Sequence, residues 1–252
     1  MIQRISIEYM TDPKGVRPLS SVLKVFALLD VFAEARKSLR LSELTRLVGG
    51  GRATVYQRLV TLMEAGWVEQ LEDGSYRLSM HSTRLAHAAL EQANLGIRTV
   101  PILQQLVDVA GETASLAVLD GGEARIVQRV ESEGVLRAEL KVGARLSLDN
   151  SASGRVLAAF VTPEVLQRWI DSGIPVPAPE MLEKVRRERF AVSGDRMEGI
   201  MATAAPVFEA GGRILAALSL VGPQQRFQAE KSRADLIAAA EKITQMIRGQ
   251  AL

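Results

Sequence analysis

The sequence contains no cysteine, and this absence excludes disulfide bonds, zinc–thiolate sites and thiol nucleophiles. It also lacks any apolar run of the ~18 residues that a transmembrane helix requires. The first residues, Met1-Ile2-Gln3-Arg4-Ile5-Ser6, do not form the apolar stretch of a secretory signal peptide. We therefore expect a cytoplasmic protein that does not associate with membranes.

The composition is that of an ordinary globular protein, with 47% hydrophobic and 24% charged residues. The 252 residues are sufficient for two domains, each with its own core. The net charge is only +2, and the surplus lies in the first 80 residues, with 11 Lys+Arg against 9 Asp+Glu. Such a small surplus is usually a solvated face, so a role in nucleic-acid binding has to be argued from motifs.

Residues 19–79 follow the pattern of a winged helix-turn-helix domain. Apolar residues at helical spacing predict three helices, which begin after Pro18, near Leu41 and at Arg52. The run Gly49-Gly50-Gly51 predicts a tight turn between the second and third helices, because glycine tolerates positive φ. Alternating residues around Asp73-Gly74 then predict a β-hairpin. Two short helices joined by a glycine turn are typical of DNA-binding domains.

The third predicted helix supplies the candidate DNA contacts, because a recognition helix places its N-terminal residues in the major groove. Glutamine pairs with adenine edges and arginine with guanine edges, whereas hydroxyl groups bind bases or phosphates. The predicted contacts are Arg52, Thr54, Tyr56, Gln57, Arg58 and Thr61, with Arg77 on the hairpin.

A small α+β domain without a nucleic-acid role is the alternative for this segment. In that case Arg58 pairs with a carboxylate and Tyr56 covers the turn. The glycine run lacks the Gly-Lys-Ser/Thr that follows a nucleotide-binding phosphate loop.

Two flanking segments complete the predicted organisation. Residues 1–18 have no clear period and form either an arm that follows the DNA backbone through Arg4, Lys14 and Arg17 or a loose terminus. Residues 80–96 predict an alanine-rich linker helix, which packs on a partner subunit or on its own chain.

Residues 97–252 predict an α+β sensor domain in which several hairpins carry helices on one side. The predicted helices span residues 100–110, 153–160, 163–172, 179–189 and 229–247. The predicted strands span residues 114–119, 124–130, 136–142, 203–208 and 213–221.

This second domain has the composition of a binding domain and not of an enzyme. It contains no histidine, no Gly-x-Ser-x-Gly elbow and no Walker loop. A Ser–Lys hydrolase is compatible with the composition, but no lysine has a diagnostic spacing to a serine. A pocket with a few hydroxyl groups on an apolar lining fits better with ligand binding. We expect no catalytic residues, no metal and no cofactor.

Several blocks of sequence occur in an order that points to one family. The first domain contains Leu41-Ser42-Glu43-Leu44 and Gly66-Trp67-Val68-Glu69, and the second contains Ser151-Ala152-Ser153-Gly154-Arg155, Ala204-Ala205-Pro206-Val207-Phe208 and Leu218-Ser219-Leu220-Val221-Gly222-Pro223. In these blocks the chain resembles the IclR family of bacterial transcriptional regulators, from about Leu19 to the C-terminus.

The resemblance implies a winged helix followed by a GAF-like effector-binding domain, assembled as a homodimer or a dimer of dimers. The family includes repressors and activators, and its effectors are often small carboxylates or aromatic compounds from catabolic pathways. By position in the family's blocks, the effector-binding residues are Ser151, Ser153, Gly154, Ser193, Asp195, Ala202, Ser219 and Val221.

Three residues depart from the family's pattern. Asp149 replaces a frequent histidine, and its carboxylate would disfavour an anionic effector if it faced the pocket. Val221 replaces a frequent serine and so removes a hydroxyl group. Gln57-Arg58 replaces a usual Arg-Leu, so the DNA specificity is this chain's own.

A structural role is the alternative for the first effector block. Ser151 or Ser153 then caps a helix, and the remaining N–H groups at that helix start suit an anion. The predicted function is a DNA-binding transcriptional regulator whose binding to double-stranded operator DNA is modulated by a small molecule. The alternatives are a ligand-independent dimeric DNA-binding protein and a small-molecule enzyme fused to a DNA-binding module.

Overall fold

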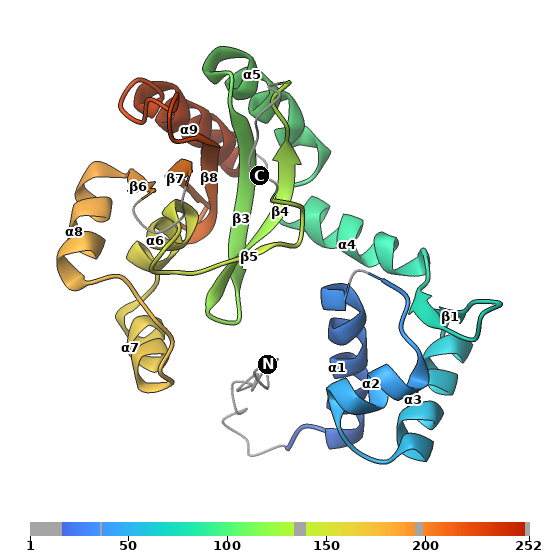
Figure 1. Ribbon diagram of the computed structural model, residues 1–252. Coiled ribbons are helices and arrows are strands. Elements are labelled where there is room, and N and C mark those ends of the chain that lie inside the picture. The colour runs from blue at the N-terminus through green and yellow to red at the C-terminus, as the bar shows by residue number, and fades with distance from the viewer. Residues whose placement is uncertain (1–16, 36, 134–139, 195–198, 250–252) are drawn as a thin grey trace. The chain divides into compact units, whose positions relative to one another are not determined.

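The computed structural model describes residues 17–35, 37–133, 140–194 and 199–249. The chain divides into two compact units between Ala89 and Leu90, within helix α4 (His81–Gln92) (Figure 1). The residue ranges predicted for the arm, winged helix, linker and effector domain stay predictions, and residues 1–16 of the arm lie outside the described residues. No helix of the described part is long and apolar enough to cross a membrane.

The N-terminal unit consists of three helices and a two-stranded hairpin. The helices are α1 (Ser20–Ala35), α2 (Leu41–Val48) and α3 (Arg52–Glu64), and the antiparallel strands are β1 (Val68–Gln70) and β2 (Tyr76–Leu78). Their apolar faces meet in one core that includes Leu28, Leu44, Val55 and Leu59. The order of elements agrees with the predicted winged helix-turn-helix.

The glycine run between α2 and α3 is required by the backbone. Gly49 and Gly50 have φ values of 71° and 97°, which side-chain-bearing residues rarely adopt. The start of α2 is held by the Arg40 N–H, which donates to Oε2 of Glu43 at 2.9 Å. This hydrogen bond, together with Lys37 beside the same carboxylate, lowers the pKa of Glu43.

The C-terminal unit is built on a six-stranded antiparallel sheet in the order β5-β4-β3-β8-β7-β6. Two long hairpins form most of the sheet, and they join where β3 pairs with β8. The strands are β3 (Thr113–Asp120), β4 (Glu123–Val130), β5 (Arg145–Leu146), β6 (Ala191–Ser193), β7 (Ile200–Phe208) and β8 (Ile214–Pro223).

Helices cover both faces of this sheet, so the prediction that they pack to one side is wrong. On one face, α5 (Val100–Ala110) and α9 (Arg233–Arg248) pack in one core with Leu116 and Leu218 (Figure 1). On the other face, α6 (Ala152–Ala159) and α8 (Pro179–Glu188) pack in a second core with Ala117 and Ala217. The central strands β3, β8 and β7 are largely apolar on both faces for this reason, as in sheets buried on both sides.

The other helices of this unit are short, and the strands differ from prediction at its edges. The 3-10 turn η1 (Ile97–Thr99) precedes α5, and α7 (Pro163–Asp171) precedes α8. Strands β5 and β6 were not predicted, because two or three residues are too few to show a period. Of the predicted strand 136–142, residues 134–139 lie outside the described residues and Leu140–Val142 are not in a strand.

We expect Leu59→Ala to lower the free energy of unfolding of the N-terminal unit by roughly 2–5 kcal/mol, because this side chain is fully buried. Each unit contains one tryptophan, Trp67 and Trp169 respectively. Urea unfolding in a Trp169→Phe background therefore reports on the N-terminal unit through Trp67. Val60→Ala, on the exposed side of the same helix, is the matched control with an expected change within ~0.5 kcal/mol. If Leu59→Ala and Val60→Ala lowered the free energy of unfolding equally, the burial of Leu59 in this core would be contradicted.

Candidate functional site

The outer face of α3 presents polar side chains to solvent. Thr54, Gln57 and Thr61 are exposed, whereas Val55 and Leu59 face the core. The three exposed residues are spaced by three and four positions, so they lie on one side of the helix. The Thr61 hydroxyl donates to the carbonyl oxygen of Gln57 at 3.0 Å, which leaves its oxygen as an acceptor.

The start of α3 offers further groups that suit DNA. Gly51 precedes the helix without a side-chain cap, and Arg52 is exposed at its first position. The first backbone N–H groups of a helix have no partner within it, so they are suited to bind phosphate. Arg58 is half-buried on the same helix.

Tyr56 and Arg77 have neighbours within the N-terminal unit. Tyr56 is 48% exposed and lies near Tyr76, whose pKa is raised by burial and further by the Tyr56 phenol. Arg77 on β2 forms an ion pair with Glu69 on β1, with 2.5 Å between Nε and Oε1. Both side chains are exposed, and such surface pairs contribute little to stability. Arg77 therefore remains able to exchange Glu69 for a phosphate.

A cavity of about 40 Å³ lies in the C-terminal unit between the sheet and the first turn of α6. Its wall combines serine hydroxyl groups with aliphatic side chains, and none of the described lining residues is charged. Six of the eight predicted effector residues line it, namely Ser151, Ser153, Ser193, Ala202, Ser219 and Val221. Gly154 is not among the lining residues, and Asp195 lies outside the described residues.

The first turn of α6 is held by side chains on both sides. The Ser151 hydroxyl accepts a hydrogen bond from the Gly154 N–H at 2.9 Å and donates to the carbonyl of Ser147 at 2.7 Å. Ser193 on β6 accepts from the Ala152 N–H at 3.0 Å. Ser151 is therefore a helix cap, as the structural alternative predicted.

The backbone N–H and the hydroxyl group of Ser153 are not used in hydrogen bonds within the described part of the chain. Ser153 is 3% exposed, and it lines the cavity. Together with the O–H of Ser193, these donors lie where the partial positive charge of a helix N-terminus favours an anion.

Arg155 fixes this turn to the rest of the unit. It is only 7% exposed, and it donates through Nε to the carbonyl of Asp149 at 2.8 Å and through Nη1 to that of Val192 at 2.5 Å. Asp149 is not among the described residues that line the cavity. Its carboxylate therefore does not form part of the cavity wall, where it would have repelled an anionic effector.

Several lining residues, which come from the sheet and its connections, were not predicted from the sequence. Two of them are polar, Asn150 and Ser115, and Ser115 is a single hydroxyl-bearing residue within the apolar run Ala114-Ser115-Leu116-Ala117. Its position in a strand that is buried on both faces was the available signal. The other residues are Ile126, Leu140, Leu146, Ala152, Gly194 and Ile200.

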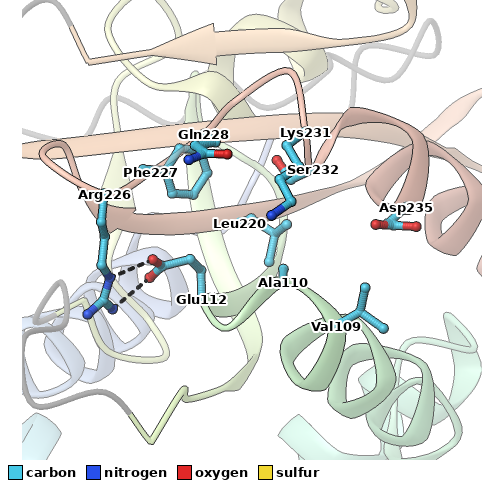
Figure 2. Close-up of a pocket in the computed structure, with 10 residues that line it drawn as sticks. All are labelled: Val109, Ala110, Glu112, Leu220, Arg226, Phe227, Gln228, Lys231, Ser232 and Asp235. Atoms are coloured by element: carbon cyan, nitrogen blue, oxygen red, sulfur yellow. Dashed lines mark hydrogen bonds and ion pairs between the residues drawn. The ribbon is translucent and has the colours of Figure 1, made fainter.

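A second cavity of about 240 Å³ lies between the end of α5 and the start of α9 (Figure 2). Leu220 lines it, whereas the neighbouring Val221 lines the serine cavity, so the two lie on opposite faces of β8. At one end Arg226 forms a two-point ion pair with the buried Glu112, at 2.8 and 3.1 Å, which raises the pKa of Arg226. A Cβ on Gly222 would lie 2.3 Å from Oε2 of Glu112, so a side chain at this position would displace the Glu112 carboxylate from its present place.

The described residues contain no cluster of three or more His, Asp or Glu side chains able to hold a metal ion. Family comparison then assigns both units. The IclR helix-turn-helix domain model matches residues 21–72, and the model of the bacterial transcriptional regulator IclR C-terminal domain matches residues 87–248. The chain belongs to the IclR family. It is a DNA-binding transcriptional regulator with an effector-binding domain, and this family is not enzymatic.

Relatives and solved structures agree with this assignment over most of the chain. The HTH-type transcriptional regulator KdgR of Escherichia coli is 30% identical, with 90% of this chain and 92% of KdgR covered. A crystal structure of an IclR regulator from Silicibacter sp. TM1040 matches with a TM-score of 0.80 and 28% identity, covering 91% of this chain and 96% of that one.

A third match concerns a liganded structure. An IclR homologue from Microbacterium hydrocarbonoxydans, solved in complex with 4-hydroxybenzoate, matches with a TM-score of 0.78. It is 23% identical, with 92% of this chain and 100% of that chain covered, so it supports the fold alone. The predicted α+β fold with an N-terminal winged helix-turn-helix and a C-terminal effector domain is confirmed.

We expect Gly154→Ala to destabilise the C-terminal unit by roughly 1–3 kcal/mol, because a Cβ there would lie 2.2 Å from the carbonyl oxygen of Ser147. Urea unfolding in a Trp67→Phe background reports on this unit through Trp169. Gly211→Ala is the matched control, because the nearest atom to its Cβ is a side-chain oxygen at 3.5 Å. A Gly154 variant as stable as the Gly211 variant would show that α6 does not need this close approach.

Proposed function

We propose that this chain binds operator DNA through α3 and the β1–β2 hairpin as a homodimer or dimer of dimers, and that a small carboxylate modulates this binding. The carboxylate binds in the serine-lined cavity at the start of α6. The observation that carries the proposal is that the free N–H and hydroxyl of Ser153 and the hydroxyl of Ser193 converge on one cavity.

The DNA half of the proposal assigns separate roles along α3. Gln57, at the centre of the exposed polar face, reads a base edge in the major groove, flanked by Thr54 and Thr61. Arg52 and the N–H groups at the start of α3 bind phosphate, as does Arg77 on the hairpin. In a two-fold symmetric assembly, the two half-sites lie one or more helical turns apart.

The effector half follows from the chemistry of the cavity wall. A carboxylate accepts hydrogen bonds only, and the wall at α6 offers donors without an opposing carboxylate. Because no described lining residue is charged, the anion is stabilised by dipoles and hydroxyl groups alone. Such a site supports moderate affinity and easy release, which suits a sensor. A carboxylate, 4-hydroxybenzoate, is also the ligand of the Microbacterium homologue.

We expect Gln57→Ala to weaken binding to the cognate duplex by roughly tenfold or more, since a two-point base contact contributes about 1–3 kcal/mol of discrimination. The cognate duplex is the one that the wild-type protein selects from a random-sequence pool. Binding to a shuffled duplex should change less than twofold, and both constants are measured by fluorescence anisotropy at several salt concentrations.

Two variants serve as comparisons for this experiment. Arg52→Ala should weaken binding to both duplexes alike and reduce the salt dependence by about one phosphate contact. Gln104→Ala, an exposed glutamine on α5 in the other unit, should leave both affinities unchanged. If Gln57→Ala lowered both affinities equally, Gln57 would not read a base.

We expect millimolar short carboxylates to raise the melting temperature of the full chain and to change its affinity for the selected duplex. A ligand that binds only the native state must stabilise it. Ser153→Ala should reduce both effects, because it removes a hydroxyl group from the cavity wall. Ser172→Ala, distant in sequence and absent from that wall, is the matched control. If no acid of a broad panel raised the melting temperature, the alternative of a ligand-independent DNA-binding protein would be favoured.

A further inference from the structure

The cavity between the end of α5 and the start of α9 has an apolar floor. Leu220 and Phe227 are buried side chains of the core that α5 and α9 form with the sheet, and Ala110 packs against the same core. Val109 also lines the cavity, and it is 68% exposed to solvent. Ligand-binding sites are typically concave and mostly apolar, with a few placed polar groups. This floor therefore suits the apolar part of a small molecule.

Charged side chains lie on two sides of this floor. On one side, Arg226 and the buried Glu112 compensate each other's charge through their two-point ion pair. On the other side lie Lys231 and Asp235, which are both exposed to solvent (Figure 2). Within the described ranges, neither Lys231 nor Asp235 forms an ion pair or a side-chain hydrogen bond. The wall thus offers one unpaired cation and one unpaired anion.

The place where α9 begins fits with the separation of these two charges. Oppositely charged residues four positions apart pair readily when both lie on one helix. Helix α9 begins at Arg233, so Lys231 lies in the turn before it and is not on the same helix as Asp235. Both charged groups therefore remain available to a ligand that lies on the apolar floor.

A zwitterion fits this wall better than an ion of either sign. A simple anion would pair with Lys231 but would meet the negative charge of Asp235, and a simple cation would have the opposite conflict. We propose that this cavity is a second ligand-binding site, which takes an α-amino acid with an apolar side chain. The carboxylate of the amino acid binds Lys231, and its ammonium group binds Asp235. Its side chain lies on Leu220 and Phe227.

The volume of the cavity agrees with a ligand of this size. Sites for drug-sized molecules usually measure ~300–1,000 Å³, so a cavity of about 240 Å³ suits a smaller molecule such as leucine or phenylalanine. The serine-lined cavity of about 40 Å³ has room for only about three water-sized groups, given ~10–15 Å³ for each, and is too small for these amino acids. The two cavities lie on opposite faces of β8, and this inference does not rest on the proposed carboxylate function.

The experiment compares each amino acid with two analogues of the same shape that each lack one charged group. The first series is L-leucine, isocaproate without the ammonium group and isoamylamine without the carboxylate. The second series is L-phenylalanine, hydrocinnamate and phenethylamine. Dissociation constants are measured by isothermal titration calorimetry on the full chain. We expect the wild type to bind the amino acid of at least one series about fivefold more tightly than either analogue, the upper range for a pair between exposed charges.

Two charge-removing substitutions separate the two contacts. Lys231→Gln should weaken the amino acid and the acid about fivefold without weakening the amine. Asp235→Asn should weaken the amino acid and the amine about fivefold without weakening the acid. Lys184→Gln on α8 and Glu241→Gln on α9 are the matched controls, because both residues are exposed and neither lines the cavity. These controls should leave all the dissociation constants unchanged.

Three results would overturn this site. The first is a wild type that binds neither amino acid, or binds both no more tightly than their analogues. The second is a loss of affinity in Lys231→Gln or Asp235→Asn that is no larger than in the matched control. The third is amino-acid binding that Ser153→Ala weakens and Lys231→Gln does not, which would place the amino acid in the serine-lined cavity. The first two results would leave the proposed carboxylate function standing, because that function depends on the other cavity.

Discussion

The effector domain depends on how closely the first turn of α6 approaches the loop before it. All eight residues of α6 are buried, so its first N–H groups can face only protein or the cavity. Gly154 permits this approach, because any side chain there would meet the backbone of Ser147. Ser151 caps the turn and Arg155 ties it to the backbone of β6. The polar wall of the cavity is thus a consequence of helix packing.

The sheet forms the opposite wall of the serine-lined cavity. Where β3 pairs with β8, alternate side chains point to opposite faces, so one strand serves the α5–α9 core and the cavity at once. Leu218 and Leu220 fill the core, whereas Ser219 and Val221 face the cavity. The cavity therefore adjoins the strand pairing that joins the two hairpins.

The sequence allowed most helices and long strands to be predicted, because their apolar period is set by local burial. The helix 100–110 and the glycine turn before α3 are examples, since φ and amphipathicity are local properties. The three-residue β6 and the packing of helices on both faces could not be predicted this way. Both depend on contacts between segments far apart in the chain, such as Ser193 with the N–H of Ala152.

The candidate site shows the same division between local and non-local information. Motif position identified six lining residues, but it could not separate Ser151, whose hydroxyl is used as a cap, from Ser153, whose hydroxyl is free. It also could not find Ser115, which lies in no motif. Val221 removes a hydroxyl group from β8, and Ser115 lies diagonally across the β3–β8 pair from it. The set of residues that lines this pocket therefore depends on the register of the sheet as well as on the positions of sequence motifs.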